Sequence, residues 1–273
     1  MCSSDLSQKR FSKRGGSFVS EVLLETHGLS RRFGGLQAVA ELDLTCRSGE
    51  ILGLIGPNGA GKTTMFNVVS RIYEPTSGSV QFRGNELLQV PAHGIAKLGI
   101  ARTFQNLALF PSMTLLENVM VGAHSQGSIG FGRAILRLGA AADNRRTRDF
   151  AGDLLAQLGL GDLAFVPAAG LPFGTLKRLE IARALAARPN FLLLDEPASG
   201  LAHGEVDELG ATIETIRSQF GLTVLLVEHH MSMVMGISDK VVAMEFGRKI
   251  AEGTPAEVQS NQRVIDAYLG TAS

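Results

Sequence analysis

The chain has 273 residues, of which 45% are hydrophobic, and its 26 basic residues (lysine and arginine) balance its 26 acidic ones. A chain of this length can bury a core of its own, whereas zero net charge argues against nucleic acid or anionic lipid as the main partner, because both normally require a basic surface. Two cysteines, Cys2 and Cys46, are too few for a disulfide framework and favour a reducing compartment, while the 32 glycines exceed the usual ~7% share.

The N-terminal part of the chain changes character near residue 19. Residues 1–18 are rich in serine, glycine, lysine and arginine and lack the apolar stretch of a signal peptide, so we expect a disordered tail followed by one domain at 19–273. Apolar residues alternate strictly over Glu41–Arg47, which predicts a half-buried, antiparallel strand with Cys46 in the core. No uninterrupted apolar run reaches about 18 residues, so no segment is predicted to span a membrane.

A glycine-rich loop follows a buried strand. Ile51–Ile55 is apolar on both faces, as in a central parallel strand, and Lys62–Ser70 has a helical pattern. Between them, glycines would let successive backbone N–H groups converge on phosphate oxygens, next to the positive end of the helix. Lys62 is expected to reach the terminal phosphates and Thr63 to offer its hydroxyl to Mg²⁺. The residues predicted to bind nucleotide here are Gly56, Pro57, Asn58, Gly59, Ala60, Gly61, Lys62, Thr63 and Thr64.

The middle of the chain has helical patterns and no convincing strand. We expect a helical subdomain at about residues 111–172, inserted into the sheet domain, with helices at Leu115–Val121 and Arg145–Leu158 and a loop at His124–Gly132. Residues 19–273 would then form one domain with this insertion.

Further strands come after the insertion. Phe191–Leu194 and Leu222–Val227 are apolar on both faces, with a helical pattern between them, and Val241–Glu252 indicates an antiparallel addition. The predicted fold class is therefore α/β: the parallel sheet of a P-loop NTPase (RecA-like), with an N-terminal antiparallel β subdomain and the inserted helical subdomain. Asp195 and Glu196 end one strand where α/β sheets bind ligands, so Asp195 is expected to hold Mg²⁺ through water and Glu196 to polarise the attacking water.

Further motifs, in the same order along the chain, resemble the ATP-binding subunits of ABC transporters over residues 23–269. Thr103-Phe104-Gln105 is similar to the glutamine loop of that family, and Val227-Glu228-His229 to the segment with its switch histidine. The resemblance implies that Phe33 stacks on adenine, that Val39 and Gln105 belong to the nucleotide site with Gln105 also at Mg²⁺, and that His229 senses the γ-phosphate. Chemistry would then depend on Glu196, Lys62 and His229.

The segment that corresponds to the signature motif of the family departs from its usual sequence. In the family this motif caps the γ-phosphate held by a partner subunit, and the resemblance implies that Gly174 does so in trans. The departures are Pro172 in place of serine, Phe173 in place of glycine and Thr175 in place of glutamine. Outside this segment, Ala202 stands in the loop after the catalytic strand where aspartate or asparagine is usual, and His230 stands where many relatives have aspartate. They leave open an alternative, a nucleotide-dependent switch subunit with weak hydrolysis.

Residues 103–122 and 246–270 are similar to the subgroup that energises uptake of branched-chain and other hydrophobic amino acids, some members of which serve amides or urea. The resemblance implies an ATPase that uses ATP and Mg²⁺ and pairs head to tail with a second ATP-binding subunit, either its own copy or a related paralogue. It would serve the transmembrane subunits of an ABC permease at the cytoplasmic face of the inner membrane, with solute supplied by a periplasmic or extracellular binding protein and no nucleic acid involved. A soluble P-loop kinase is the remaining alternative, which the order of the motifs disfavours.

Overall fold

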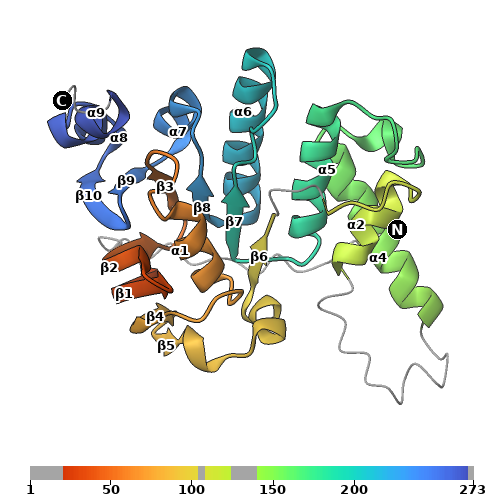
Figure 1. The fold of residues 1–273 in the computed structure, drawn as a ribbon. Helices are drawn as coiled ribbons and strands as arrows, with labels where there is room; N and C mark the ends of the chain where they lie inside the picture. Colours follow the sequence, from red (N-terminus) through yellow and green to blue (C-terminus); the bar gives the residue numbers. More distant parts are fainter. Residues whose placement is uncertain (1–20, 104–107, 124–139, 270–273) are drawn as a thin grey trace, which may run out of the picture.

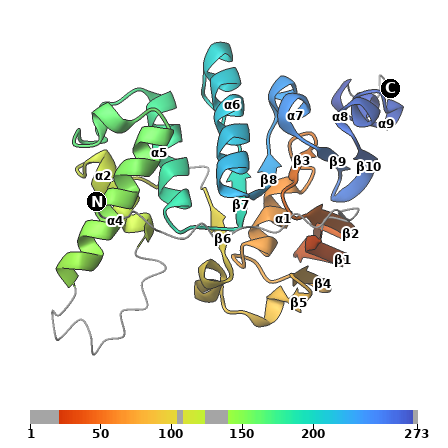
Figure 2. The ribbon, with the colours of Figure 1, turned by 180° about the vertical axis from the view of Figure 1, so that it is seen from behind.

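The computed structural model describes residues 21–103, 108–123 and 140–269 (Figure 1). The predicted tail at residues 1–18, the predicted loop at His124–Gly132 and the site residue Gln105 lie outside these ranges. In the described part of the chain, two β-sheets lie beside each other and a group of helices extends from the edge of the larger sheet (Figures 1 and 2).

The larger sheet has six strands in the order β10-β9-β3-β8-β7-β6. Its strands are β3 (Ile51–Ile55), β6 (Ile100–Arg102), β7 (Phe191–Asp195), β8 (Thr223–Val227), β9 (Lys240–Glu245) and β10 (Arg248–Gly253). All neighbouring strands pair in parallel except β10, which pairs antiparallel with β9. Every residue of β3, β7 and β8 is buried, as expected for parallel strands covered on both faces. These three are the strands that the apolar runs predicted.

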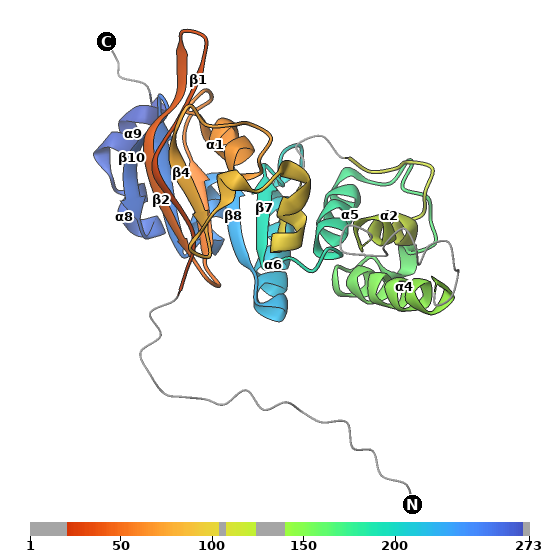
Figure 3. The same ribbon diagram turned by 90° about the horizontal axis from the view of Figure 1, so that it is seen from below.

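The two faces of this sheet bury different cores. Leu52 and Leu54 belong to a core shared with Phe66 of α1 (Lys62–Val69) and with the second sheet, whereas Ile51 and Ile55 belong to the core on the opposite face. That opposite face is covered by α6 (His203–Phe220) and α7 (Met231–Ile237). Figure 3 shows α1 and α6 on opposite sides of β7 and β8. Because successive side chains of a strand point to opposite faces of the sheet, only every second residue of β3 packs on the face that α1 covers.

The second sheet is antiparallel, with the order β2-β1-β4-β5. Its strands are β1 (Val22–Phe33), β2 (Leu36–Arg47), β4 (Ser77–Phe82) and β5 (Asn85–Glu86). The prediction placed the start of β2 at Glu41, five residues too late. Val39 and Ala40 are both buried and Glu41 has a left-handed backbone (φ 49°), so an irregularity breaks the alternation on which the prediction depended. Cys46 lies in the core as predicted, and burial raises the pKa of its thiol.

Among the residues that the structure describes between β6 and β7, three α-helices form this group: α2 (Leu115–Ala123), α4 (Ala140–Gln157) and α5 (Phe173–Leu185). The three helices lie together beside the larger sheet (Figure 1), and their buried leucines, such as Leu116, Leu154 and Leu185, belong to one core. Both predicted helices are present, and α4 begins five residues earlier than expected. The other elements within the described ranges are α8 (Pro255–Gln259), α9 (Gln262–Leu269) and the 3₁₀ turns Leu87–Gln89, Ala92–Leu98 and Gly161–Leu163.

The α2–α5 contact is close enough to require a glycine. A Cβ atom on Gly122 of α2 would overlap the backbone carbonyl oxygen of Arg183 on α5. The backbone of α5 cannot give way cheaply, because Arg183 lies within the helix. Gly122 therefore sets the distance between the two helices.

Replacing Gly122 with alanine is expected to lower the free energy of unfolding by about 1–3 kcal/mol, the usual cost of forcing a carbon into a packed contact. Gly152→Ala in α4 is the matched control, because a Cβ there meets nothing within 4 Å. The control should be neutral or stabilising by up to about 1 kcal/mol, since glycine costs conformational entropy within a helix. Urea unfolding of both variants measures the difference, and equal stability would contradict the close contact.

Candidate functional site

The predicted phosphate loop connects β3 to α1 and packs directly against two strands. Gly61 precedes α1 in a left-handed conformation (φ 98°), and a Cβ there would overlap the Ala38 carbonyl oxygen of β2. Gly56 has φ 150°, and a Cβ there would overlap the Met244 carbonyl oxygen of β9. Both glycines are thus required by backbone conformation and by close approach. The loop is therefore packed between a strand of each sheet, β2 and β9.

This loop forms one wall of a cleft of about 580 Å³. The cleft is lined by Phe33, Leu36, Gln37, Ala38, Asn58, Gly59, Ala60, Gly61, Lys62, Thr63, Thr64, Glu196 and Phe246. Most of the residues predicted for the phosphate loop are therefore brought together with Phe33 and Glu196. Gly56 and Pro57 do not line the cleft, and Val39 lies fully buried in the core.

Two aromatic side chains stand at this cleft. The Phe33 ring is 38% exposed, packs edge-on against Tyr73 with ring centroids 5.3 Å apart, and has the Arg31 guanidinium 4.5 Å from its centroid. Phe246, which is 82% exposed, lies in the turn between β9 and β10. An exposed aromatic ring beside a phosphate-binding loop can stack on a base. Phe246 was not among the residues predicted for the site, because no sequence motif marks it.

The Lys62 side chain folds back over the phosphate loop and bonds to the first two residues of that loop. Its Nζ atom donates hydrogen bonds to the carbonyl oxygens of Gly56 (2.5 Å) and Pro57 (3.0 Å). Burial lowers the pKa of its ammonium group, and the nearby carboxylates Glu196 and Asp195 oppose that shift. An anion bound in the cleft would stabilise the charged form further, because it would bring negative charge to a desolvated cation.

The carboxylates at the end of β7 have different surroundings. Glu196 lines the cleft, and its backbone N–H donates to the Val227 carbonyl oxygen (2.8 Å) while its φ is 46°. A left-handed conformation is strained for glutamate, and such strain is common at functional sites. Asp195 is buried beneath it, and its Oδ2 atom accepts a hydrogen bond from Arg102 Nη2 (2.8 Å). Burial raises the pKa of the Asp195 carboxyl, and the Arg102 ion pair opposes that rise.

A third carboxylate, Glu228, joins the loops that follow β7 and β8. It is fully buried, and its Oε1 atom accepts a hydrogen bond from the Ala198 N–H (2.7 Å). Its Oε2 atom accepts bonds from the His229 N–H (2.8 Å) and the His230 N–H (3.1 Å), and lies 3.0 Å from His230 Nδ1. Glu228 had no predicted role, although its position directly after a buried strand was a signal in the sequence.

The predicted phosphate sensor, His229, lies outside the cleft lining. Its side chain is 48% exposed, and its ring stacks on that of His230 with centroids 4.3 Å apart. The hydrogen bond from the His229 N–H to Glu228 therefore fixes the backbone of His229, while the imidazole ring of His229 remains accessible to solvent. Its sensor role stays a prediction.

The start of α5 is also away from the cleft lining. Pro172 precedes the helix without a side-chain hydrogen bond to it, and Gly174 contacts Glu205 at the start of α6. Phe173 is 43% exposed and packs beside Gly200, in the loop after β7. The structure therefore does not bring Gly174 to the nucleotide cleft of its own chain, and the predicted action in trans stays a prediction.

Comparison with known proteins agrees with this geometry. A sequence model of the ABC transporter family matches residues 39–199, and a model described as branched-chain amino acid ATP-binding cassette transporter matches residues 248–273. The high-affinity branched-chain amino acid transport ATP-binding protein BraF of Pseudomonas aeruginosa is 42% identical over 255 residues, covering 93% of this chain and 100% of that protein. LivG of Salmonella typhimurium, which carries the same description, is 43% identical with the same coverage.

Solved structures show the same fold. The crystal structure of the ADP conformation of an ATP-binding cassette from an ABC transporter superposes with a TM-score of 0.80 at 27% identity, covering 92% of this chain and 100% of the other. The predicted fold class and the predicted family resemblance are both confirmed by these matches and by the sheet topology.

Lys62→Ala is expected to weaken ATP binding by about 10- to 100-fold, because a hydrogen bond to a charged group contributes about 1.5–3 kcal/mol. Titration with a fluorescent ATP analogue measures the change, and thermal unfolding checks that the variant folds. The control is Lys97→Ala, which removes an exposed lysine outside the cleft. Equal affinities of the two variants would contradict the phosphate-loop assignment.

Proposed function

The chain belongs to the ABC transporter family, and we propose that it is the ATP-hydrolysing subunit of an importer for branched-chain or related hydrophobic amino acids. The observation that carries this proposal is the single cleft in which the phosphate loop, Phe33 and Glu196 meet. The solute class is supported by the described functions of BraF and LivG and by the match over residues 248–273.

ATP would bind with its phosphates on the loop and its base toward the aromatic rim. The N-terminus of α1 and the loop N–H groups offer fixed donors, Lys62 supplies the positive charge, and Phe33 supplies a ring for adenine. These groups come from both sheets, so the site exists only in the folded chain. Its donors are already oriented, which lowers the entropy cost of binding.

The residues present suit a magnesium ion, which prefers oxygen ligands and often keeps part of its water shell. The Asp195 Oδ1 atom is buried and has no hydrogen-bond partner among the residues that the structure describes, so it can accept a bond from a metal-bound water. Thr63, at the cleft, carries the hydroxyl predicted to bind the ion; Gln105 lies outside the described residues. When bound, Mg²⁺ would neutralise charge on the β- and γ-phosphates.

Hydrolysis would depend on Glu196. Its carboxylate faces the same cleft as the phosphate loop, so it can orient a water molecule and accept its proton as the water attacks the γ-phosphate. Lys62 would stabilise the charge that develops on the phosphate oxygens. His229 would sense the γ-phosphate from a backbone position that Glu228 fixes.

Work on a membrane partner would come from a difference in ATP affinity between open and closed states, since a ligand shifts an equilibrium only by its differential affinity. We propose a head-to-tail pair with a second ATP-binding subunit, a copy or a related paralogue, in which Gly174 caps the partner's nucleotide. The pair would act on permease transmembrane subunits at the cytoplasmic face of the inner membrane, with solute delivered by a binding protein. In the described ranges, no helix is long and apolar enough to cross a bilayer.

One observation favours a second candidate, a switch subunit that binds ATP but hydrolyses it weakly. Pro172 offers no side-chain hydrogen bond at the start of α5, and Thr175 is buried, so neither presents a hydroxyl to a partner's phosphate. Backbone N–H groups from Gly174 onward would be the remaining donors. Steady-state ATPase activity of the assembled transporter distinguishes the two candidates.

Glu196→Gln is expected to keep ATP binding and to slow hydrolysis by about 10²- to 10⁴-fold, the usual contribution of a general base. Phosphate release from the assembled transporter measures turnover, and analogue titration measures binding. Near-normal hydrolysis would contradict the role of Glu196, and the Lys97→Ala variant should behave as wild type in both assays.

The solute class is tested in cells that lack this chain. Uptake of labelled leucine should fall, the wild-type chain should restore it, and Glu196→Gln should not, because transport needs turnover. Labelled urea and acetamide are measured in parallel. Loss of urea or acetamide uptake with normal leucine uptake would replace the amino-acid proposal with an amide or urea importer.

A further inference from the structure

We propose that Arg102 is a positioning residue for the metal site: it anchors one oxygen of Asp195 and ties that carboxylate to the helix that begins at the phosphate loop. Arg102 is the last residue of β6 and does not line the cleft, so it acts through Asp195. The inference rests on the proposed function, because it assigns a task within the same ATP site.

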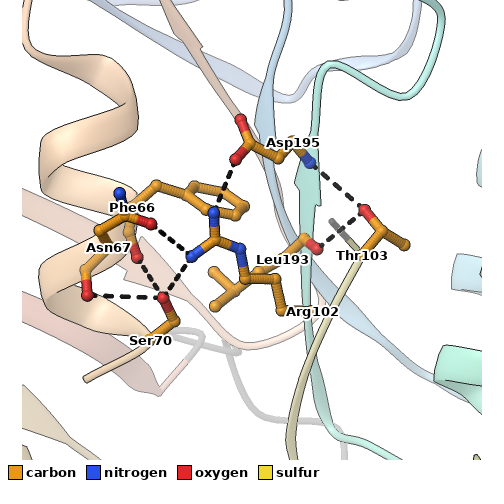
Figure 4. Close-up of polar contacts among 7 residues, drawn as sticks. All are labelled: Phe66, Asn67, Ser70, Arg102, Thr103, Leu193 and Asp195. Carbon is orange, nitrogen blue, oxygen red and sulfur yellow. Dashed lines mark hydrogen bonds and ion pairs between the residues drawn. The ribbon is translucent and has the colours of Figure 1, made fainter. Parts of the chain in front are cut away.

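The guanidinium of Arg102 spans the gap between α1 and β7 (Figure 4). Its Nη2 atom donates to Asp195 Oδ2 (2.8 Å), and its Nη1 atom donates to Asn67 Oδ1 (2.7 Å) and Ser70 Oγ (2.6 Å). The Cζ atom of Arg102 also lies over the Phe66 ring, 4.7 Å from the ring centroid. One side chain thus contacts two residues of α1 (Phe66 and Asn67), the residue that follows this helix (Ser70) and the carboxylate at the end of β7.

This bridge is buried. The Arg102 side chain is 9% exposed and that of Asp195 is 1% exposed. A buried carboxylate without a partner is costly, so the pair is retained because each charge compensates the other. The planar fork of arginine holds donors on separate nitrogens that reach two partners on opposite sides, whereas the three donors of lysine all sit on one nitrogen.

The main chain of Asp195 is held by a second set of hydrogen bonds. Arg102 is in register with Leu193, and the next residue, Thr103, donates its N–H to the Leu193 carbonyl oxygen (2.9 Å). The Asp195 N–H in turn donates a hydrogen bond to the hydroxyl oxygen of Thr103, with a distance of 3.4 Å from N to Oγ1. Asp195 is therefore held at its main chain by the hydroxyl of Thr103, the residue after β6, and at Oδ2 by the Arg102 side chain.

These contacts determine which oxygen remains for a ligand. With Oδ2 taken by Arg102, Oδ1 is the atom left buried without a hydrogen-bond partner among the described residues. A metal-bound water is a donor that would satisfy it. Loss of Arg102 would free the carboxylate to rotate and would release the contact to α1, so the metal site would lose its fixed geometry although its ligands remain.

The test separates metal binding from nucleotide binding. Mn²⁺ affinity in the presence of ATP is measured from the electron paramagnetic resonance signal of free Mn²⁺, and ATP affinity without metal is measured in EDTA. Arg102→Met should weaken Mn²⁺ binding by about 10- to 100-fold, as loss of a residue that orients a metal ligand usually does. ATP affinity in EDTA should stay within about twofold of wild type, because the loop amides are unchanged.

Arg71→Met is the matched control. Arg71 is a neighbouring, largely buried arginine that binds Glu74 and the Val90 carbonyl oxygen instead of Asp195. It should keep wild-type Mn²⁺ affinity even where it lowers thermal stability. An equal loss of Mn²⁺ affinity in Arg71→Met would overturn the proposal, since the effect would then be one of general destabilisation.

An unchanged or tighter Mn²⁺ affinity in Arg102→Met would also overturn the proposal, because Arg102 would then be neutral or would compete with the ion. In an Asp195→Asn background, Arg102→Met should cause no further loss, and an undiminished loss would show that Arg102 acts elsewhere. Should Arg102→Met fail to fold, Arg102→Lys decides: weaker Mn²⁺ binding supports the proposal and wild-type affinity overturns it. Failure of the wild-type chain to bind ATP would instead overturn the proposed function itself.

Discussion

Burial of charge at the ends of β7 and β8 constrains the whole nucleotide site. Asp195 and Glu228 are almost completely removed from solvent, so each must find donors within the protein. Asp195 accepts a hydrogen bond from Arg102, whose side chain connects α1 and β6 to β7. Glu228 accepts hydrogen bonds from the N–H groups of Ala198, His229 and His230. These two carboxylates thereby connect α1 and β6 to β7, and the loop after β7 to the loop after β8.

The parts of this site that the sequence predicts are those set by local pattern. The phosphate loop needs glycines within a few positions, and β3, β7 and β8 need continuous apolar runs, so each leaves a signal in neighbouring residues. The Arg102–Asp195 pair spans 93 positions and the Ala198–Glu228 bond spans 30, so nothing in the vicinity of either residue announces its partner. The early part of β2 was missed for a related reason, because pairing with β1 tolerates an irregularity at Glu41 that the alternation rule does not.

The two halves of the chemistry lie on different parts of the chain. Phosphate binding and the Glu196 carboxylate share one cleft, whereas the start of α5 packs against α6 and the loop after β7. This separation suits the proposed head-to-tail pair, in which one subunit supplies the cleft and the other supplies the cap. The close α2–α5 contact at Gly122 and the buried core shared by α2, α4 and α5 couple these helices, so a displacement of α5 would act on α2 directly.

The left-handed backbone of Glu196 sets stability against activity at a single position. Glycine would adopt φ 46° without strain, and would therefore relax the chain at the end of β7 while deleting the carboxylate on which hydrolysis depends. Selection for stability alone would favour that replacement. A glutamate at this position costs stability and is useful only for ATP hydrolysis. A related chain that no longer needs to drive transport would therefore be expected to lose this residue, and with it hydrolysis, without harm to the fold.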